Sequence, residues 1–147
     1  TYPGKEDDKA NALYYDAMVE AVGQRCNVIY TAINYRKMKS ERVVGKAMRN
    51  LMQKHPEIRE KLIVATKGGF IPRDIESGEE PLEYFQNRFL KRDILNEEDI
   101  VKGCHSLRTE FIHECVLMSL GNFGLEYIDI YYIHNPEDAL QIINEFA

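Results

Sequence analysis

Residues 62–69 read LIVATKGG, an apolar run that ends in a lysine and two glycines. Two further runs of this kind occur, NVIYTA at 27–32 and YIDIYYIH at 127–134. None of the three shows the strict alternation of apolar and polar residues that is typical of a strand with one solvent face. We therefore expect three strands that are covered on both faces, as in a parallel sheet.

Helical patterns separate these strands. Their expected starts are Asp7 or Asp8, then Ser40, then Thr109, and finally Asn135 with Pro136. The expected ends of the first three are Gly23, His55 with Pro56, and Gly124. The order is helix, strand, helix, strand, long connection, helix, strand, helix. This order predicts an α/β fold of right-handed βαβ units, either an open parallel sheet or a closed barrel.

The connection over residues 68–108 is too long for a plain loop. Within it, the pattern predicts short helices at 81–90 and 97–101, separated by charged turns. Long connections in compact domains often serve as lids or binding elements. This segment is therefore a candidate to cover a site.

The composition excludes several classes of function. With 147 residues, of which 44% are hydrophobic, the chain is expected to form one domain over residues 1–147. A net charge of −5 argues against a nucleic-acid partner. No apolar run approaches the roughly 20 residues of a membrane helix. We expect a soluble, cytoplasmic protein, and three cysteines without CxxC spacing (Cys26, Cys104 and Cys115) agree with reduced thiols.

One group of residues has the side chains that zinc prefers, namely Cys104, His105, His113 and Cys115. His113 and Cys115 are two positions apart on an expected helix, so their side chains point to different faces. Closing four ligands around one ion is awkward from such positions. The sequence therefore predicts no metal site.

Each strand run leads, on its carboxyl side, to a residue that strand interiors rarely contain: Tyr35, Lys67 and His134. In parallel α/β folds these strand ends meet on the face where ligands bind. A phenol with a pKa near 10 donates a proton at neutral pH only if its phenolate is stabilised, and a nearby ammonium does this. A histidine N–H can orient a carbonyl group. The trio therefore favours reduction of a carbonyl by hydride from a nicotinamide.

Each of these residues also has an ordinary structural interpretation. Lys67 could extend its ammonium to water from a strand end, and His134 could be a buried histidine whose partner is the main chain. A tyrosine in a loop is usually not catalytic. Gly68 and Gly69, without a P-loop or GxGxxG pattern, favour a tight turn over phosphate binding.

A family resemblance supports the functional interpretation. The strings NVIYTAINYR (27–36), SERVVGKAM (40–48), KLIVATKGG (61–69) and SLGNFGLEYIDIYYIHNP (119–136) closely resemble the aldo-keto reductases. Members of that family are NADP(H)-dependent oxidoreductases on a (β/α)8 TIM-type barrel, and they reduce aldehydes or ketones. The resemblance extends over essentially the whole chain. It implies that the three strands and their helices form a partial barrel, roughly the first half.

The resemblance assigns roles to individual residues. It implies that Tyr35 is the proton donor, that Lys67 tunes it and that His134 orients a small-molecule carbonyl substrate. For the NADP(H) cofactor, it implies contacts from Thr1, Tyr2 and Thr31.

The family motif has an aspartate where this chain has Tyr30. That carboxylate would pair with Lys67, whereas a phenol carries no negative charge and is bulkier. We expect Tyr30 to point into the packed interior of the barrel and to leave Lys67 with a weaker partner.

The resemblance also implies that the chain is truncated relative to the family. The strands that carry most adenosine-side contacts to the cofactor are expected beyond residue 147, and residues are expected upstream of Thr1. A partial barrel has unpaired sheet edges, which favour self-association. The alternative function is therefore a catalytically impaired family member that acts as a non-catalytic binding or assembly module.

Overall fold

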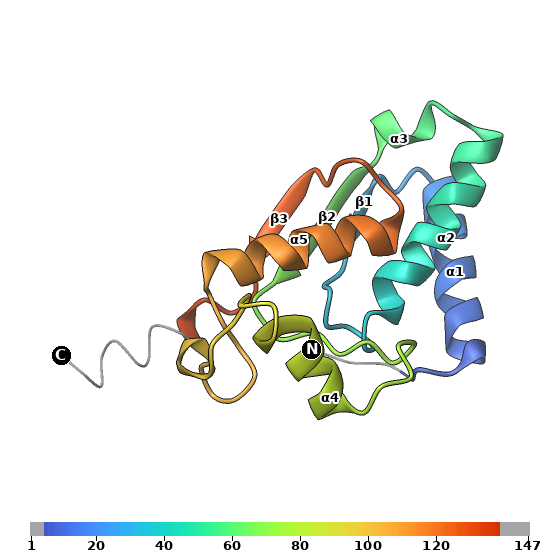
Figure 1. Ribbon diagram of the computed structural model, residues 1–147. Coiled ribbons are helices and arrows are strands. Elements are labelled where there is room, and N and C mark those ends of the chain that lie inside the picture. The colour runs from blue at the N-terminus through green and yellow to red at the C-terminus, as the bar shows by residue number, and fades with distance from the viewer. Residues whose placement is uncertain (1–4, 139–147) are drawn as a thin grey trace.

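The computed structural model describes residues 5–138, which form an α/β fold around a three-stranded parallel sheet (Figure 1). The strands are β1 (Val28–Tyr30), β2 (Ile63–Gly68) and β3 (Ile130–Ile133), in the order β1-β2-β3. Both pairings are parallel, and Ala65 lies between Tyr30 and Ile130 in register. The predicted parallel sheet with intervening helices is confirmed, as an open sheet in which β1 and β3 each pair only with β2 among the described residues.

Three long helices alternate with the strands, namely α1 (Asp8–Gly23), α2 (Lys39–Lys54) and α5 (Thr109–Phe123). A short helix, α3 (Ile58–Lys61), leads into β2 and was not predicted. The long connection contains α4 (Pro81–Phe85), a π-helical segment η1 (Gln86–Leu90) and a 3₁₀ turn η2 (Glu97–Asp99), which confirms the short helices predicted there.

The helix ends are partly as predicted. Asp7 begins α1, because its Oδ1 accepts a hydrogen bond from the Ala10 N–H at 2.8 Å. Gly124 ends α5 with a left-handed φ of 66°. The helix predicted to start at Asn135 with Pro136 is described only as far as Asp138; Pro136 lies in a turn, and Glu137 and Asp138 are helical.

The predicted start of α2 at Ser40 is wrong, because the helix begins at Lys39. Arg36, Lys37 and Met38 all have left-handed φ values (50°, 53° and 72°), so the chain turns sharply before the helix. This turn brings the carbonyl of Tyr35 within 3.4 Å of the Ser40 N–H. Main-chain acceptors therefore replace the side-chain cap that the sequence suggested.

The predicted cap at Thr109 is wrong by one residue. Thr109 is the first residue of α5, and Arg108 precedes it without a capping side-chain hydrogen bond, although its guanidinium donates to the Glu110 carboxylate at 3.1 Å. The Oγ of Ser106 accepts from the Arg108 N–H at 3.2 Å, so the polar side chain that ends the preceding loop lies upstream of Thr109.

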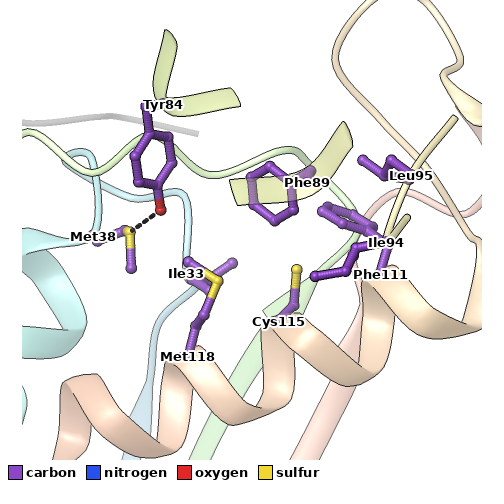
Figure 2. Close-up of a cluster of buried hydrophobic side chains, with 9 residues drawn as sticks. All are labelled: Ile33, Met38, Tyr84, Phe89, Ile94, Leu95, Phe111, Cys115 and Met118. Carbon is purple, nitrogen blue, oxygen red and sulfur yellow. Dashed lines mark hydrogen bonds between the residues drawn. The ribbon is translucent and has the colours of Figure 1, made fainter. Parts of the chain in front are cut away.

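The long connection contributes to the hydrophobic core rather than lying loosely over it. Tyr84 and Phe89 pack with side chains from α5 and from the segment after β1 in one buried cluster, whose members are Ile33, Met38, Tyr84, Phe89, Ile94, Leu95, Phe111, Cys115 and Met118 (Figure 2). The Tyr84 hydroxyl contacts the sulfur of Met38 at 4.0 Å. This packing anchors the connection beside the carboxyl ends of the strands.

The two faces of the sheet differ. One face is covered by α2 and α5, where Val64 packs with Met48 and Phe123; in Figure 1, α5 runs across the three strands. Alternation along the strands places Lys67 on the opposite face, together with exposed apolar side chains at Val28, Tyr30, Ile63, Ile130 and Tyr132. The expectation of strands covered on both faces is therefore wrong for the described residues.

A buried carboxyl group joins the covered face to the helices. Glu41 of α2 is fully buried and accepts hydrogen bonds from the Thr66 hydroxyl at 2.6 Å and from the Asn122 amide at 2.8 Å. Burial raises the pKa of Glu41 above the ordinary value of 4.5, although these hydrogen bonds oppose the shift. The free energy needed to deprotonate Glu41 is therefore larger in the folded chain than in the unfolded chain.

This difference predicts a pH-dependent stability. A raised carboxyl pKa contributes stability at low pH, and this contribution is lost as the pH rises above 4.5 towards the folded-state pKa. Glu41→Gln should flatten this part of the profile of unfolding free energy, measured by urea denaturation. The exposed Glu20→Gln is the control and should leave the profile unchanged. An unchanged profile in Glu41→Gln would show that the carboxyl group is not destabilised by burial.

Candidate active site

The segment after β1 continues the sheet and positions the predicted tyrosine. The Thr31 N–H donates to the Ala65 carbonyl at 3.0 Å, and the Ile33 N–H donates to the Lys67 carbonyl at 3.2 Å. The chain then turns, with the Tyr35 N–H donating to the Ala32 carbonyl at 3.1 Å. Strand-like pairing thus continues beyond the end of β1 and runs alongside β2 as far as Lys67, and the turn that follows contains Tyr35.

Lys67 lies beside two other residues of the predicted site, Tyr30 and Tyr35. Lys67 is 5% exposed, and its ammonium donates to the Thr31 carbonyl at 3.1 Å. The same nitrogen lies 4.0 Å from the ring centroid of Tyr30 and 4.3 Å from that of Tyr35. Within residues 5–138, no carboxylate lies within ion-pair distance of it. A carbonyl and two aromatic rings therefore stabilise this buried charge.

The close packing predicted around Tyr30 is not found among the described residues. Its side chain belongs to the uncovered face and the residue is 59% exposed, so it is not packed into an interior among the described residues. Its ring meets the ring of Tyr132 edge to face, with centroids 6.0 Å apart. Because Tyr132 is paired in register with Lys67, the two tyrosines lie on the open face beside the lysine.

His134 follows directly after β3 and is 4% exposed. Its ring packs edge to face against Tyr35 at a centroid distance of 5.9 Å and against Phe70 at 4.8 Å. Burial lowers the pKa of His134 to about 4, and the positive charge of Lys67 adds to this effect. The imidazole is therefore neutral at pH 7.

The structure brings Tyr35, Lys67 and His134 together, because the Tyr35 ring contacts both of the other side chains. They pack against one another rather than around an open space. A nearby cavity of about 380 Å³ is lined by Tyr30, Thr31 and Tyr35 together with residues of α1 and α2, but not by Lys67 or His134.

The residues expected to contact the cofactor are only partly described. Thr1 and Tyr2 lie outside the described residues. Thr31 is buried, and its carbonyl is the acceptor for Lys67.

Three residues that contact Tyr30 or His134 were not predicted from the sequence, namely Tyr132, Phe70 and His105. Tyr132 could have been found, because it lies two positions before His134 and therefore shares its side of the strand. Phe70 follows the two glycines and gave no signal. His105 was considered only as a metal ligand, although its ring nitrogen lies 2.6 Å from the main-chain oxygen of His134.

Two further properties concern the described part of the chain as a whole. No group of three or more His, Cys, Asp or Glu side chains there is arranged to hold a metal ion. In the same residues, no helix has both the length and the apolar character needed to span a bilayer.

The sequence was compared with family models and with curated proteins. The model described as "Aldo/keto reductase family" matches residues 2–147. The chain belongs to the aldo/keto reductase family. No curated protein matched the chain. The recognised resemblance is thereby confirmed, and the chain is an oxidoreductase of the aldo/keto reductase type.

Family membership explains the asymmetry of the sheet. An aldo/keto reductase is a TIM barrel, and the three parallel strands with their outer helices form an open part of one. In a closed barrel the helices surround the strands and the opposite face is the interior. The face that carries Lys67, Tyr30 and Tyr132 therefore corresponds to the interior side of a barrel.

The neighbours of Lys67 give a testable consequence. Tyr30→Asp would place a carboxylate beside the Lys67 ammonium, which has no carboxylate partner among residues 5–138. A hydrogen bond to a charged group contributes about 1.5–3 kcal/mol. We expect the carbonyl-reduction rate to rise on the order of tenfold, which corresponds to about 1.4 kcal/mol of transition-state stabilisation. Tyr30→Asn has the same size without the charge and should give no such rise. Equal rates for the two variants would mean that charge at this position is irrelevant.

Proposed function

We propose that the chain catalyses NADP(H)-dependent reduction of an aldehyde or ketone, with Tyr35 as the proton donor. The observation that carries this proposal is that the Tyr35 ring contacts both the Lys67 ammonium, at 4.3 Å, and the His134 ring, at 5.9 Å. The three side chains come from three separate strand ends, as the catalytic end of a TIM barrel requires.

We assign to Lys67 the stabilisation of charge during proton transfer from Tyr35. When a carbonyl oxygen takes the phenol proton, negative charge develops on the Tyr35 oxygen, and a nearby ammonium stabilises that charge. Lys67 is nearly inaccessible to water, so the attraction is less screened than at a surface. The Thr31 carbonyl fixes the ammonium in place through its hydrogen bond.

His134 suits the role of a neutral hydrogen-bond partner. Its lowered pKa of about 4 keeps the imidazole uncharged at pH 7, so it does not compete with Tyr35 as an acid. Neither of its ring nitrogens is hydrogen-bonded to a described residue, and Nδ1 is buried. A substrate carbonyl can therefore be oriented by the imidazole N–H while Tyr35 donates the proton.

The residues present are compatible with a nicotinamide. The rings of Tyr30 and Tyr132 are half-exposed on the interior face beside Lys67, and they present aromatic surface against which a nicotinamide ring can pack. We assign these rings and Thr31 to the cofactor side of the site, with Thr1 and Tyr2 as the contacts implied by the family resemblance. Bound NADPH supplies the hydride.

We further propose that residues 1–147 belong to a single domain and that the protein is cytoplasmic. The support for the compartment is that Cys26, Cys104 and Cys115 are all free thiols, as is usual in a reducing environment.

Tyr35→Phe tests the proton donor. Loss of a general acid costs typically about 10²- to 10⁴-fold, so this variant should lose at least about a hundredfold in kcat with an aldehyde panel. The decrease in NADPH absorbance measures the rate. Tyr127→Phe is the matched control, because it keeps the ring beside Arg59 and should retain activity. A Tyr35→Phe variant as active as the control would exclude Tyr35 as the acid.

A second candidate function is the non-catalytic binding or assembly module. It is favoured by the exposed apolar side chains on the interior face and by β1 and β3, each of which has one partner among the described residues. The reduction assay separates the two candidates. NADPH oxidation that depends on Tyr35 supports the reductase, whereas its absence with every aldehyde, together with concentration-dependent self-association, supports the module.

A further inference from the structure

We propose that His105 is a positioning residue that holds His134 in the site by donating its Nε2–H to the main-chain carbonyl of His134. The two atoms lie 2.6 Å apart, and His105 is fully buried. The contact is independent of the catalytic assignment. Its significance for catalysis rests on the proposed function, in which His134 orients the carbonyl.

The backbone of His105 is fixed on two sides. It forms isolated antiparallel bridges with both Val101 and Phe70. The Val101 N–H donates to the His105 carbonyl at 2.7 Å, and the His105 N–H donates to the Val101 carbonyl at 3.0 Å. The next residue, Ser106, donates its N–H to the Gly69 carbonyl at 2.9 Å. These hydrogen bonds hold His105 of the long connection beside the end of β2.

His134 sits where regular structure ends. Its N–H donates to the Gly68 carbonyl at 2.7 Å, which extends the pairing of β2 and β3 by one residue. Asn135 then takes a left-handed φ of 47°, and the chain turns away. The hydrogen bond from His105 satisfies the carbonyl of His134 at this turn. Both main-chain polar groups of His134 are therefore fixed, and with them the direction of its side chain.

Phe70 and Gly69 lie against this contact between the two histidines. The Phe70 ring packs edge to face against His105 at a centroid distance of 5.0 Å and against His134 at 4.8 Å. Gly69 has a φ of 137°, and a Cβ there would lie 2.7 Å from the His105 Nε2 and 3.0 Å from the His134 oxygen. Glycine is therefore required at this position for the imidazole to reach the carbonyl.

The hydrogen bond specifies a tautomer. A carbonyl oxygen can only accept, so the Nε2 of His105 must carry the proton of this hydrogen bond, and the buried Nδ1 has no partner among the described residues. Nitrogen chemical shifts of ¹⁵N-histidine-labelled protein should show His105 protonated on Nε2, with a proton that exchanges slowly with water. Protonation on Nδ1, or rapid exchange, would overturn the proposal. This measurement uses the unchanged chain, so it does not depend on whether a variant folds.

A pair of variants tests the positioning role. His105→Gln keeps a donor close to the position of Nε2, whereas His105→Phe keeps the ring shape without a donor; both remove the imidazole as a titrating group. We expect the NMR titration midpoint of His134, about 4 in the unchanged chain, to move towards the ordinary 6.5 in His105→Phe and to remain low in His105→Gln. Lys67 and Tyr35, which also face His134, are unchanged in both variants.

Kinetics provide the second readout. His105→Phe should raise KM for the carbonyl substrate several-fold, and His105→Gln should restore it. Equal behaviour of the two variants in the titration, whether both shift or neither does, would overturn the proposal. A shift confined to His105→Phe in a protein without reductase activity would refute the proposed function and leave the positioning role intact.

Discussion

The site depends on a single buried charge. Lys67 is on the interior face of the central strand, and its ammonium is held by the Thr31 carbonyl and by the rings of Tyr30 and Tyr35. A buried ammonium without hydrogen bonds or a counter-charge would be strongly unfavourable. The segment after β1 therefore has to follow β2 closely enough to supply both the carbonyl and the rings. This requirement places Tyr35 beside the strand ends.

The same charge affects the histidine. Burial among Tyr35 and Phe70 disfavours the imidazolium form of His134, and the ammonium of Lys67 disfavours it further. One cation thus helps to keep the histidine neutral and, in the proposed function, stabilises the negative charge that develops on the tyrosine oxygen. The proposed division of roles between acid and orienting group rests on this arrangement, in which Tyr30 stands where the family resemblance implies a carboxylate.

Much of this could be predicted from the sequence, because the signals are local. Apolar runs located the three strands, and the residues at their ends identified Tyr35, Lys67 and His134. Other features depend on contacts between distant segments. The exposure of Tyr30 depends on which elements cover the interior face, and the bond from His105 to His134 joins residues 29 positions apart. The start of α2 was misplaced because three successive left-handed residues left no recognisable signal in the side chains.

In this arrangement, the Lys67 ammonium lies between the rings of Tyr30 and Tyr35. Nuclear Overhauser spectroscopy of the folded chain tests it most directly. The ε-methylene protons of Lys67 should show cross-peaks to the ring protons of both tyrosines and should resonate upfield, because they lie close to two aromatic rings. Random-coil shifts for these protons, with no cross-peak to either ring, would show that the Lys67 side chain does not lie between the two tyrosines.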